Sequence, residues 1–149
     1  MFGDLETNPK KWPMEKLKDH SDIIAGNPFN SNGYTENGIK ICGSLIIMPD
    51  RIAWEDCKYW TSSDGLDTYL LESGDIVLAM DRPWISSGFK IAKIKENELP
   101  ALLIQRTARI RGTDLNQDMI LAMLSTKSFE KHCNITSTTV PHISMGDIR

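Results

Sequence analysis

The sequence predicts an α+β fold in which a mixed, twisted β-sheet is combined with a few short helices. Short apolar stretches bounded by glycine, proline or charged residues fill the middle of the chain, which is typical of strands. Apolar residues recur at helical spacing only after Gly112. The 149 residues are 40% hydrophobic and 25% charged, as in an ordinary globular domain. A chain of this length can bury a sizeable hydrophobic core, and it favours a single domain over two very small ones.

Four stretches rich in branched apolar residues are expected to be strands. They are residues 39–49, 74–81, 88–95 and 101–111. The last stretch alternates, with Leu102, Ile104, Ala108 and Ile110 on one face and Gln105, Thr107, Arg109 and Arg111 on the other. Arg106 interrupts this alternation near the middle of the stretch. We therefore expect one long strand with an apolar and a polar face.

The segments around these strands have different signals. Residues 25–38 are dense in Gly, Asn, Pro and Ser, which predicts a long exposed loop. Residues up to about Asp22 are expected to be a leading segment that packs Trp12 onto the domain. Asp114 is the expected N-cap of a helix whose apolar positions are Leu115, Met119, Ile120, Met123 and Leu124. A second short helix is expected around Phe129, followed by an extended segment over 136–141.

Basic residues are concentrated between Arg82 and Arg111. That window holds seven lysines and arginines against two glutamates, although the whole chain has a formal net charge of −3. A basic stripe on an otherwise acidic domain can follow a phosphate backbone. The same residues can instead form the solvated face of a sheet. The sequence alone leaves both interpretations open.

Several classes of protein and site are not expected. Apolar runs such as 45–48 and 101–104 are far shorter than the roughly 20 residues of a transmembrane helix. The acidic N-terminal residues do not resemble a secretory signal, so we expect a cytoplasmic protein. Three widely spaced cysteines favour reduced thiols over disulfides or a zinc site. No glycine-rich dinucleotide turn or P-loop is present, and no cofactor is expected.

Two short motifs resemble catalytic sites only superficially. Asp50 followed by Asp56 and Lys58 has the letters of a metal-dependent nuclease, but the five residues between the aspartates leave little room for a hairpin. Asn27-Pro28-Phe29 resembles the box of adenine methyltransferases but lacks its second proline. The histidines at 20, 132 and 142 do not have the spacing of metal ligands. We expect a protein that is not an enzyme, with a metal-dependent nuclease or a protein interaction module as the alternatives.

Four segments in order resemble one known family. They are Gly26–Ile41 (GNPFNSNGYTENGIKI), Ser73–Ile94, Leu99–Gly112 and Thr139–Ile148. Together they resemble a target recognition domain of the specificity subunit of type I restriction-modification enzymes. The resemblance implies non-catalytic binding of double-stranded DNA, with one half of a bipartite site read by each such domain. It also implies methyltransferase (modification) and restriction subunits as partners.

The resemblance also sets expectations for the domain boundaries and the DNA-binding residues. The chain ends at Arg149, where the helical spacer of the family would begin, so we expect residues 1–149 to be one recognition domain, a fragment or half of a specificity subunit. Arginine pairs best with guanine, and asparagine or glutamine with adenine. The expected base readers are Asn30, Asn32, Arg51, Arg82 and Gln105. The residues expected to position the DNA backbone are Lys90, Lys93, Lys95, Arg109 and Arg111.

Overall fold

The computed structural model describes residues 15–136 and 142–149, and it confirms the α+β class. The strands are β1 (Ser21–Ala25), β2 (Ile39–Cys42), β3 (Ile47–Met48), β4 (Arg51–Ile52), β5 (Lys58–Trp60), β6 (Ile76–Ala79), β7 (Trp84–Ile85), β8 (Gly88–Phe89), β9 (Ile91–Lys93), β10 (Ala101–Leu103) and β11 (Thr107–Gly112). The helices are α1 (Gln117–Leu124), α2 (Lys127–Thr136) and α3 (Met145–Ile148). Five short 3-10 helices, η1 to η5, lie in the described connections: Leu17–Asp19, Ser31–Gly33, Trp54–Asp56, Asp67–Tyr69 and Glu96–Glu98.

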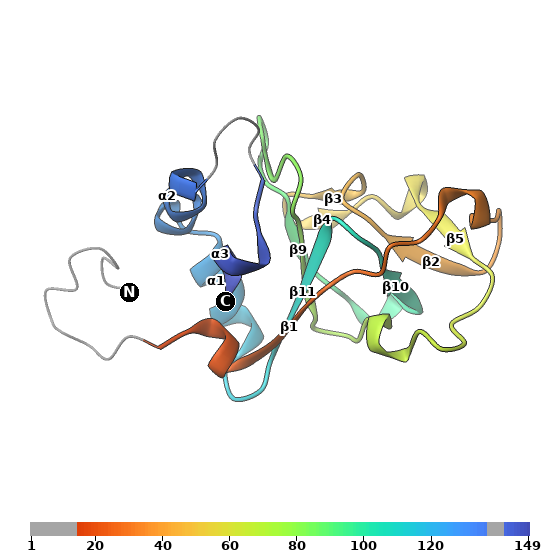
Figure 1. Cartoon of the computed structure of the whole chain (residues 1–149), viewed down its shortest axis with the longest axis horizontal. Helices are drawn as coiled ribbons and strands as arrows, with labels where there is room; N and C mark the ends of the chain where they lie inside the picture. The colour runs from red at the N-terminus through yellow and green to blue at the C-terminus, as the bar shows by residue number, and fades with distance from the viewer. Residues whose placement is uncertain (1–14, 137–141) are drawn as a thin grey trace, which may run out of the picture.

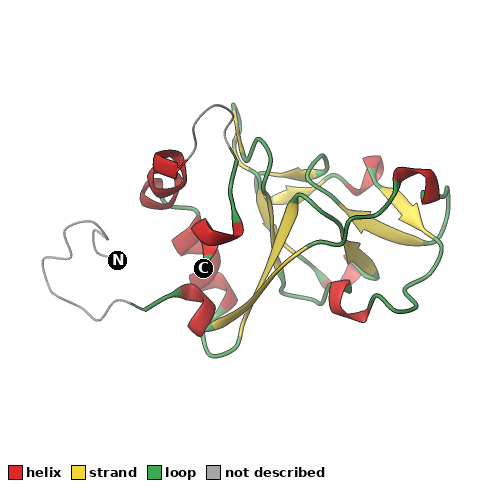
Figure 2. Ribbon diagram, in the orientation of Figure 1, coloured by secondary structure: helices red, strands yellow, loops and turns green. Residues whose placement is uncertain are grey.

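The central layer is a four-stranded antiparallel sheet with the order β1-β11-β6-β9. In its register Arg109 of β11 lies between Ile24 of β1 and Val77 of β6. Figures 1 and 2 show helices α1, α2 and α3 on one side of this sheet and the strands β2, β5 and β10 on the other. The central sheet is therefore covered on both faces.

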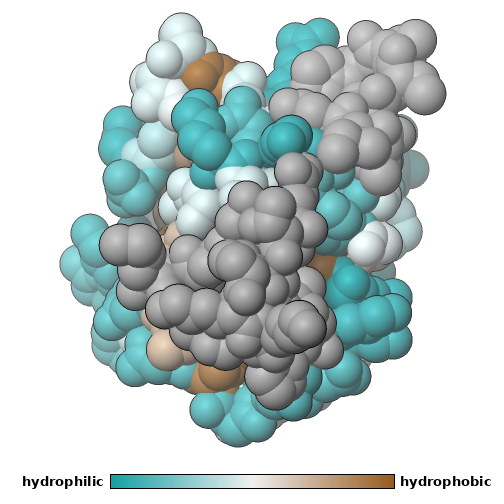
Figure 3. Space-filling model, turned by 90° about the vertical axis from the view of Figure 1, so that its left-hand side faces the viewer, coloured by the Kyte–Doolittle hydropathy of each residue, from teal (hydrophilic) through white to brown (hydrophobic). Residues whose placement is uncertain are grey.

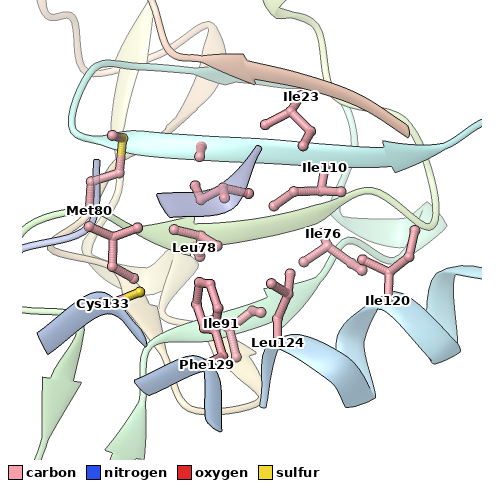
Figure 4. Close-up of a cluster of buried hydrophobic side chains, with 13 residues drawn as sticks. Ile23, Ile76, Leu78, Met80, Ile91, Ile110, Ile120, Leu124, Phe129 and Cys133 are labelled. Carbon is pink, nitrogen blue, oxygen red and sulfur yellow. The ribbon is translucent and has the colours of Figure 1, made fainter. Parts of the chain in front are cut away.

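The helical side holds one hydrophobic core. Ile76, Leu78 and Ile110 project from the sheet toward the helices, as Figure 4 shows. Ile120 and Leu124 of α1 cover them at the expected spacing of four residues. The remaining buried members of this core are Ile23, Met80, Ile91, Ala108, Phe129, Cys133, Ile143 and Ile148. Both predicted helices are thus confirmed as the cover of this face.

The opposite side holds a second core. A three-stranded sheet with the order β10-β2-β5 combines a parallel pair, β10 with β2, and an antiparallel pair, β2 with β5. The hairpin of β3 and β4 adds further apolar side chains. The buried residues of this core are Cys42, Ile46, Ile47, Ile52, Ala53, Leu71, Val77, Ala92, Ile94, Ala101 and Leu103. The expected mixed sheet therefore exists, but as a second layer beside an antiparallel one.

The predicted strand over 101–111 is two strands in different sheets. β10 ends at Leu103, and β11 starts at Thr107 in the central sheet. Arg106 has a φ of 67°, a left-handed conformation that ends an extended strand. The interruption of the pattern at Arg106 therefore marks a turn between two layers. The stretches 39–49 and 88–95 are likewise each divided, into β2 and β3 and into β8 and β9.

The predicted N-cap of the first helix is wrong by two residues. The side chain of Asn116 caps α1 by accepting hydrogen bonds from the backbone N–H groups of Asp118 and Met119. Asp114 instead bonds His20. The expected packing of Trp12 and most of the extended segment expected over 136–141 lie outside the described residues.

The described surface of the helical side is mostly hydrophilic, and its hydrophobic residues occur in separate small patches (Figure 3). No helix within residues 15–136 or 142–149 is long and apolar enough to span a bilayer.

Candidate nucleic-acid interface

The ten residues predicted to contact DNA do not form one surface. Arg82, Lys90 and Gln105 lie at the end of the central sheet where β6 finishes and β11 starts. Asn30 and Asn32 lie in the loop that follows β1. The other five are distributed over β4, the opposite end of the central sheet and its interior: Arg51, Lys93, Lys95, Arg109 and Arg111.

The first group surrounds an ion pair that the sequence did not predict. Arg106 Nε donates to Asp81 Oδ2 at 2.7 Å, and Arg106 Nη2 donates to Asp81 Oδ1. The side chains remain 56% and 44% exposed, respectively. The hydrogen bonds from Arg106 lower the pKa of Asp81, and the charges of Arg106, His142 and Arg82 act in the same direction. Asp81 also forms an antiparallel backbone bridge with His142.

Lys90 lies behind this ion pair. Only 7% of the residue is exposed, and it forms no ion pair in the described part of the chain. Burial lowers its pKa, and repulsion by Arg82 lowers it further, whereas attraction by Asp81 opposes the change. We name Asp81, Arg82, Lys90, Arg106 and His142 the sheet-end cluster.

The backbone at this end of the sheet is held in an uncommon conformation. Asp50, Arg82 and Arg106 are the three non-glycine residues with positive φ among those described, at 61°, 46° and 67°. Asp50 joins this end because its N–H donates to the carbonyl oxygen of Ile91 at 3.0 Å. The carbonyl oxygen of Arg106 accepts from Met80 N at 2.9 Å and also from Ser44 Oγ. A positive φ at a residue other than glycine costs conformational free energy, so it persists only where surrounding contacts support it. Such residues are concentrated at functional sites.

The asparagine-rich loop is an ordered element next to the Gln105 turn. Asn30 Oδ1 accepts from the N–H of Asn32 at 2.9 Å, which caps η2. Phe29 anchors the loop by packing on Trp60, with ring centroids 4.5 Å apart. Gln105 N donates to Asn27 O at 2.8 Å. The exposed side chains of Asn30, Asn32 and Gln105 therefore belong to two segments joined by a backbone hydrogen bond.

Most of the other residues predicted to contact DNA are paired with acidic neighbours. Arg111 donates to the buried carboxylate of Asp75 through Nε at 2.7 Å and Nη2 at 2.8 Å. Lys93 pairs with Asp118 of α1. Arg51 pairs with Glu55 at 2.6 Å. Lys95 is exposed and forms no ion pair within the described ranges.

Arg109 is inside the protein. Its side chain is 3% exposed, and Nη2 donates to Asp22 Oδ2 at 2.7 Å. Nε and Nη1 are buried without a hydrogen-bond partner among the described residues. The alternation of β11 is as predicted, since Ala108 and Ile110 point to the helices, but the polar face is covered by the second sheet. The interpretation as a solvated face is therefore wrong for Arg109, which is not on the surface of the described structure.

The three residues of the nuclease-like motif do not form a metal site in the described structure. Asp50 lies in the β3–β4 turn, Asp56 ends η3, and Lys58 starts β5. Within the described ranges, no three histidine, cysteine, aspartate or glutamate side chains are grouped so that they could hold a metal ion.

Comparison with known proteins gives two curated relatives. The MjaVIII specificity subunit of Methanocaldococcus jannaschii is 32% identical over 142 residues, which are 91% of this chain and 33% of that protein. The EcoAI specificity subunit of Escherichia coli is 28% identical over 141 residues, 91% of this chain and 24% of that protein. Both are described as specificity subunits of type I restriction enzymes.

The chain is related in sequence to type I specificity subunits. The resemblance seen in the four segments is thereby confirmed, and the chain spans between a quarter and a third of the length of these relatives. No protein-family model matches.

Solved structures share the fold. The HsdS subunit of Thermoanaerobacter tengcongensis superposes with a TM-score of 0.62 at 17% identity, covering 90% of this chain and 30% of that one. A chain from a structural study of the assembly and conformational transition of a type I restriction-modification system gives a TM-score of 0.60 at 16% identity, covering 89% and 31%. About nine-tenths of this chain thus shares its fold with about 30% of each of these two chains.

Proposed function

We propose that residues 1–149 form one target recognition domain of a type I specificity subunit, and that it reads one half of a bipartite DNA site. The observation that carries the proposal is the similarity of 91% of the chain to a quarter to a third of two type I specificity subunits. A segment of that size that folds around its own two cores is suited to act as one module of a larger subunit. The module would act in the cytoplasm with modification and restriction subunits that supply the catalysis.

The exposed polar side chains around the Gln105 turn are the proposed readers. Gln105, Asn30 and Asn32 carry amide groups that donate and accept hydrogen bonds, as contact with adenine requires. Arg82 is exposed at the same end of the sheet and forms no ion pair with an acidic side chain among the described residues. Main-chain hydrogen bonds hold the turn of Gln105 without occupying its side chain. Asn30 uses Oδ1 to cap η2, and its amide N–H groups remain free to donate to a base.

A domain exchange tests this function. One recognition domain of a characterised type I specificity subunit is replaced by residues 1–149, the complex is purified, and methylated adenines are mapped across the host genome. We expect a new half-site in place of the old one. An assembled complex that methylates nothing, or that keeps the old site alone, would contradict the proposal.

A pair of variants in the exchanged subunit separates base reading from general effects. Asn32→Ala removes an exposed asparagine of η2 in the asparagine-rich loop, and Asn97→Ala removes an exposed asparagine of η5, which is outside the proposed readers. We expect Asn32→Ala to relax the half-site and Asn97→Ala to leave it unchanged. Equal effects of the two would remove the loop from the proposed readers.

A further inference from the structure

The sheet-end cluster has more positive charge than its single carboxylate balances. Arg82, Lys90 and Arg106 interact electrostatically with Asp81, and His142 also adds to the field at Asp81. Three cations around one carboxylate leave an excess of two positive charges. Elsewhere in the basic window, Lys93, Arg109 and Arg111 each have a carboxylate of their own. Lys95 forms no ion pair among the described residues, but it is a single charge, so the sheet-end cluster has the largest excess of positive charge in the described part of the window.

The hydrogen-bond donors of the cluster are presented to solvent. Asp81 holds Arg106 by its Nε and Nη2, so the remaining Nη1 of a half-exposed guanidinium is available for a second anion. Arg82 is exposed, and its φ of 46° sets the direction of the chain as it leaves Asp81. Lys90 lies behind the ion pair and adds a positive charge there. Because the residue is buried, keeping its ammonium group charged and unpaired costs free energy. A bound anion would reduce that cost.

We propose that the sheet-end cluster is a binding site for a backbone phosphate of duplex DNA, with Arg82 and Arg106 as donors and Asp81 as the residue that positions Arg106. This proposal rests on the proposed function, because it names the part of the domain that fixes the DNA backbone while the neighbouring amides read bases. Gln105 directly precedes Arg106 in the same turn. A DNA phosphate bound to Arg106 would therefore bring the edges of the neighbouring bases within reach of the Gln105 side chain.

Magnetic resonance on the ¹⁵N-labelled full chain tests the site directly. The chain is titrated with a short duplex of arbitrary sequence and, separately, with inorganic phosphate. We expect the duplex to shift the side-chain Nε–H signals of Arg82 and Arg106 and the backbone amide of Asp81. Shifts centred on Lys93 and Lys95 would overturn the assignment, and so would a response of the cluster to inorganic phosphate without a response to DNA.

Charge variants give the second measurement, namely affinity for the same duplex over a series of salt concentrations. Each phosphate contact adds about 0.9 to the slope of log affinity against log salt, so Arg82→Gln should reduce the slope by about one. Arg82→Lys keeps the charge and should retain most of the slope. Asp81→Asn keeps one acceptor for Arg106 and removes the negative charge, so it should tighten binding several-fold.

Lys127→Gln is the matched control, because it also removes one positive charge and its side chain is 95% exposed on α2, in the helical layer. If Lys127→Gln and Arg82→Gln change the slope equally, the effect is one of net charge and the site is overturned. If the duplex produces no shifts at millimolar concentration, the phosphate site is also overturned. The half-site function is decided separately by the methylation map of the exchanged subunit, so failure of one proposal is distinguishable from failure of the other.

Discussion

Gly26 lies so close to Ile104 that a Cβ atom on Gly26 would stand 1.9 Å from the carbonyl oxygen of Ile104. The contact joins the start of the asparagine-rich loop to the turn that carries Gln105 and Arg106. Two backbone hydrogen bonds reinforce it, Gly26 N to Thr107 O at 3.1 Å and Gln105 N to Asn27 O at 2.8 Å. The relative position of the proposed base readers therefore depends on a glycine.

Gly26→Ala should destabilise the fold and displace the loop. The clash is with backbone atoms, which cannot move aside as a flexible side chain can, so we expect a loss of about 2 kcal/mol or more in the free energy of unfolding. Chemical denaturation measures it. Gly146→Ala is the control, because its Cβ would lie 3.5 Å from Ser144 Oγ, an ordinary contact, and it should stay within about 1 kcal/mol of the wild type. Equal stability of the two variants would contradict the close approach.

Arg109 is predicted to be a structural residue. Arg109→Met removes the buried cation and leaves Asp22, which is 56% exposed and stays hydrated, so the free energy of unfolding should stay within about 1 kcal/mol of the wild-type value or rise. Asp22→Ala leaves the guanidinium buried without its acceptor and should cost about 1–3 kcal/mol. The salt dependence of DNA binding by Arg109→Met should equal that of the wild type. A reduced slope would show that Arg109 reaches phosphate after all.

Asp75 is expected to be a strong contributor to stability. Its carboxylate is 1% exposed, accepts two hydrogen bonds from Arg111 and also accepts the N–H of Glu72 at 2.7 Å. Asp75→Ala should cost about 3 kcal/mol, because Arg111 and a backbone donor both lose their partner. Glu72→Gln removes a second, 67% exposed partner of Arg111 and should cost less than about 1 kcal/mol. Thermal unfolding of the two variants side by side tests this ranking.

His20 should make stability depend on pH. Nδ1 of His20 bonds Asp114 at 2.9 Å and Nε2 bonds Glu15, and these hydrogen bonds raise the pKa of His20 above 6.5. A raised pKa in the folded state stabilises the protein below the unfolded pKa, and this contribution is lost as the pH rises through the folded value. The Tm difference between the wild type and His20→Gln should therefore shrink from pH 5.5 to 8.5. Asp114→Asn should reduce the pH dependence as well, and a constant difference would exclude this role.

Local patterns predicted the elements whose signal lies within a few neighbouring residues. The helical spacing of apolar residues indicated α1, of which Ile120 and Leu124 are buried, whereas Met119 and Met123, expected on the same face, are exposed. The Gly and Asn content of 25–38 indicated the loop. The number of sheets could not be predicted in this way. The break at Arg106 requires a positive φ at a residue that is not glycine, and the burial of the polar face of β11 depends on a second sheet from distant segments.

The sequence predicted only part of the candidate site, because local patterns do not show which distant residues meet in the fold. Arg82, Lys90 and Gln105 were selected for their residue types, and the structure places them at one end of the central sheet. Asp81 was missed because its partner Arg106 is 25 residues away. The one signal that indicated Arg106 was the break in the alternation of 101–111. Arg109 and Asp22 are 87 residues apart, so nothing local showed that this arginine is neutralised inside the protein.

The hydrogen bonds that fix Asn27 to Leu103 and Gln105 use main-chain atoms only. Neither hydrophobic core contains Asn32 or Gln105, so their side chains can be exchanged with little cost to folding, whereas Asn30 also caps η2. A domain that reads DNA in the way proposed would benefit from this separation between the residues that keep it folded and those that vary. We expect related domains with different targets to differ most at these turns and least at Gly26.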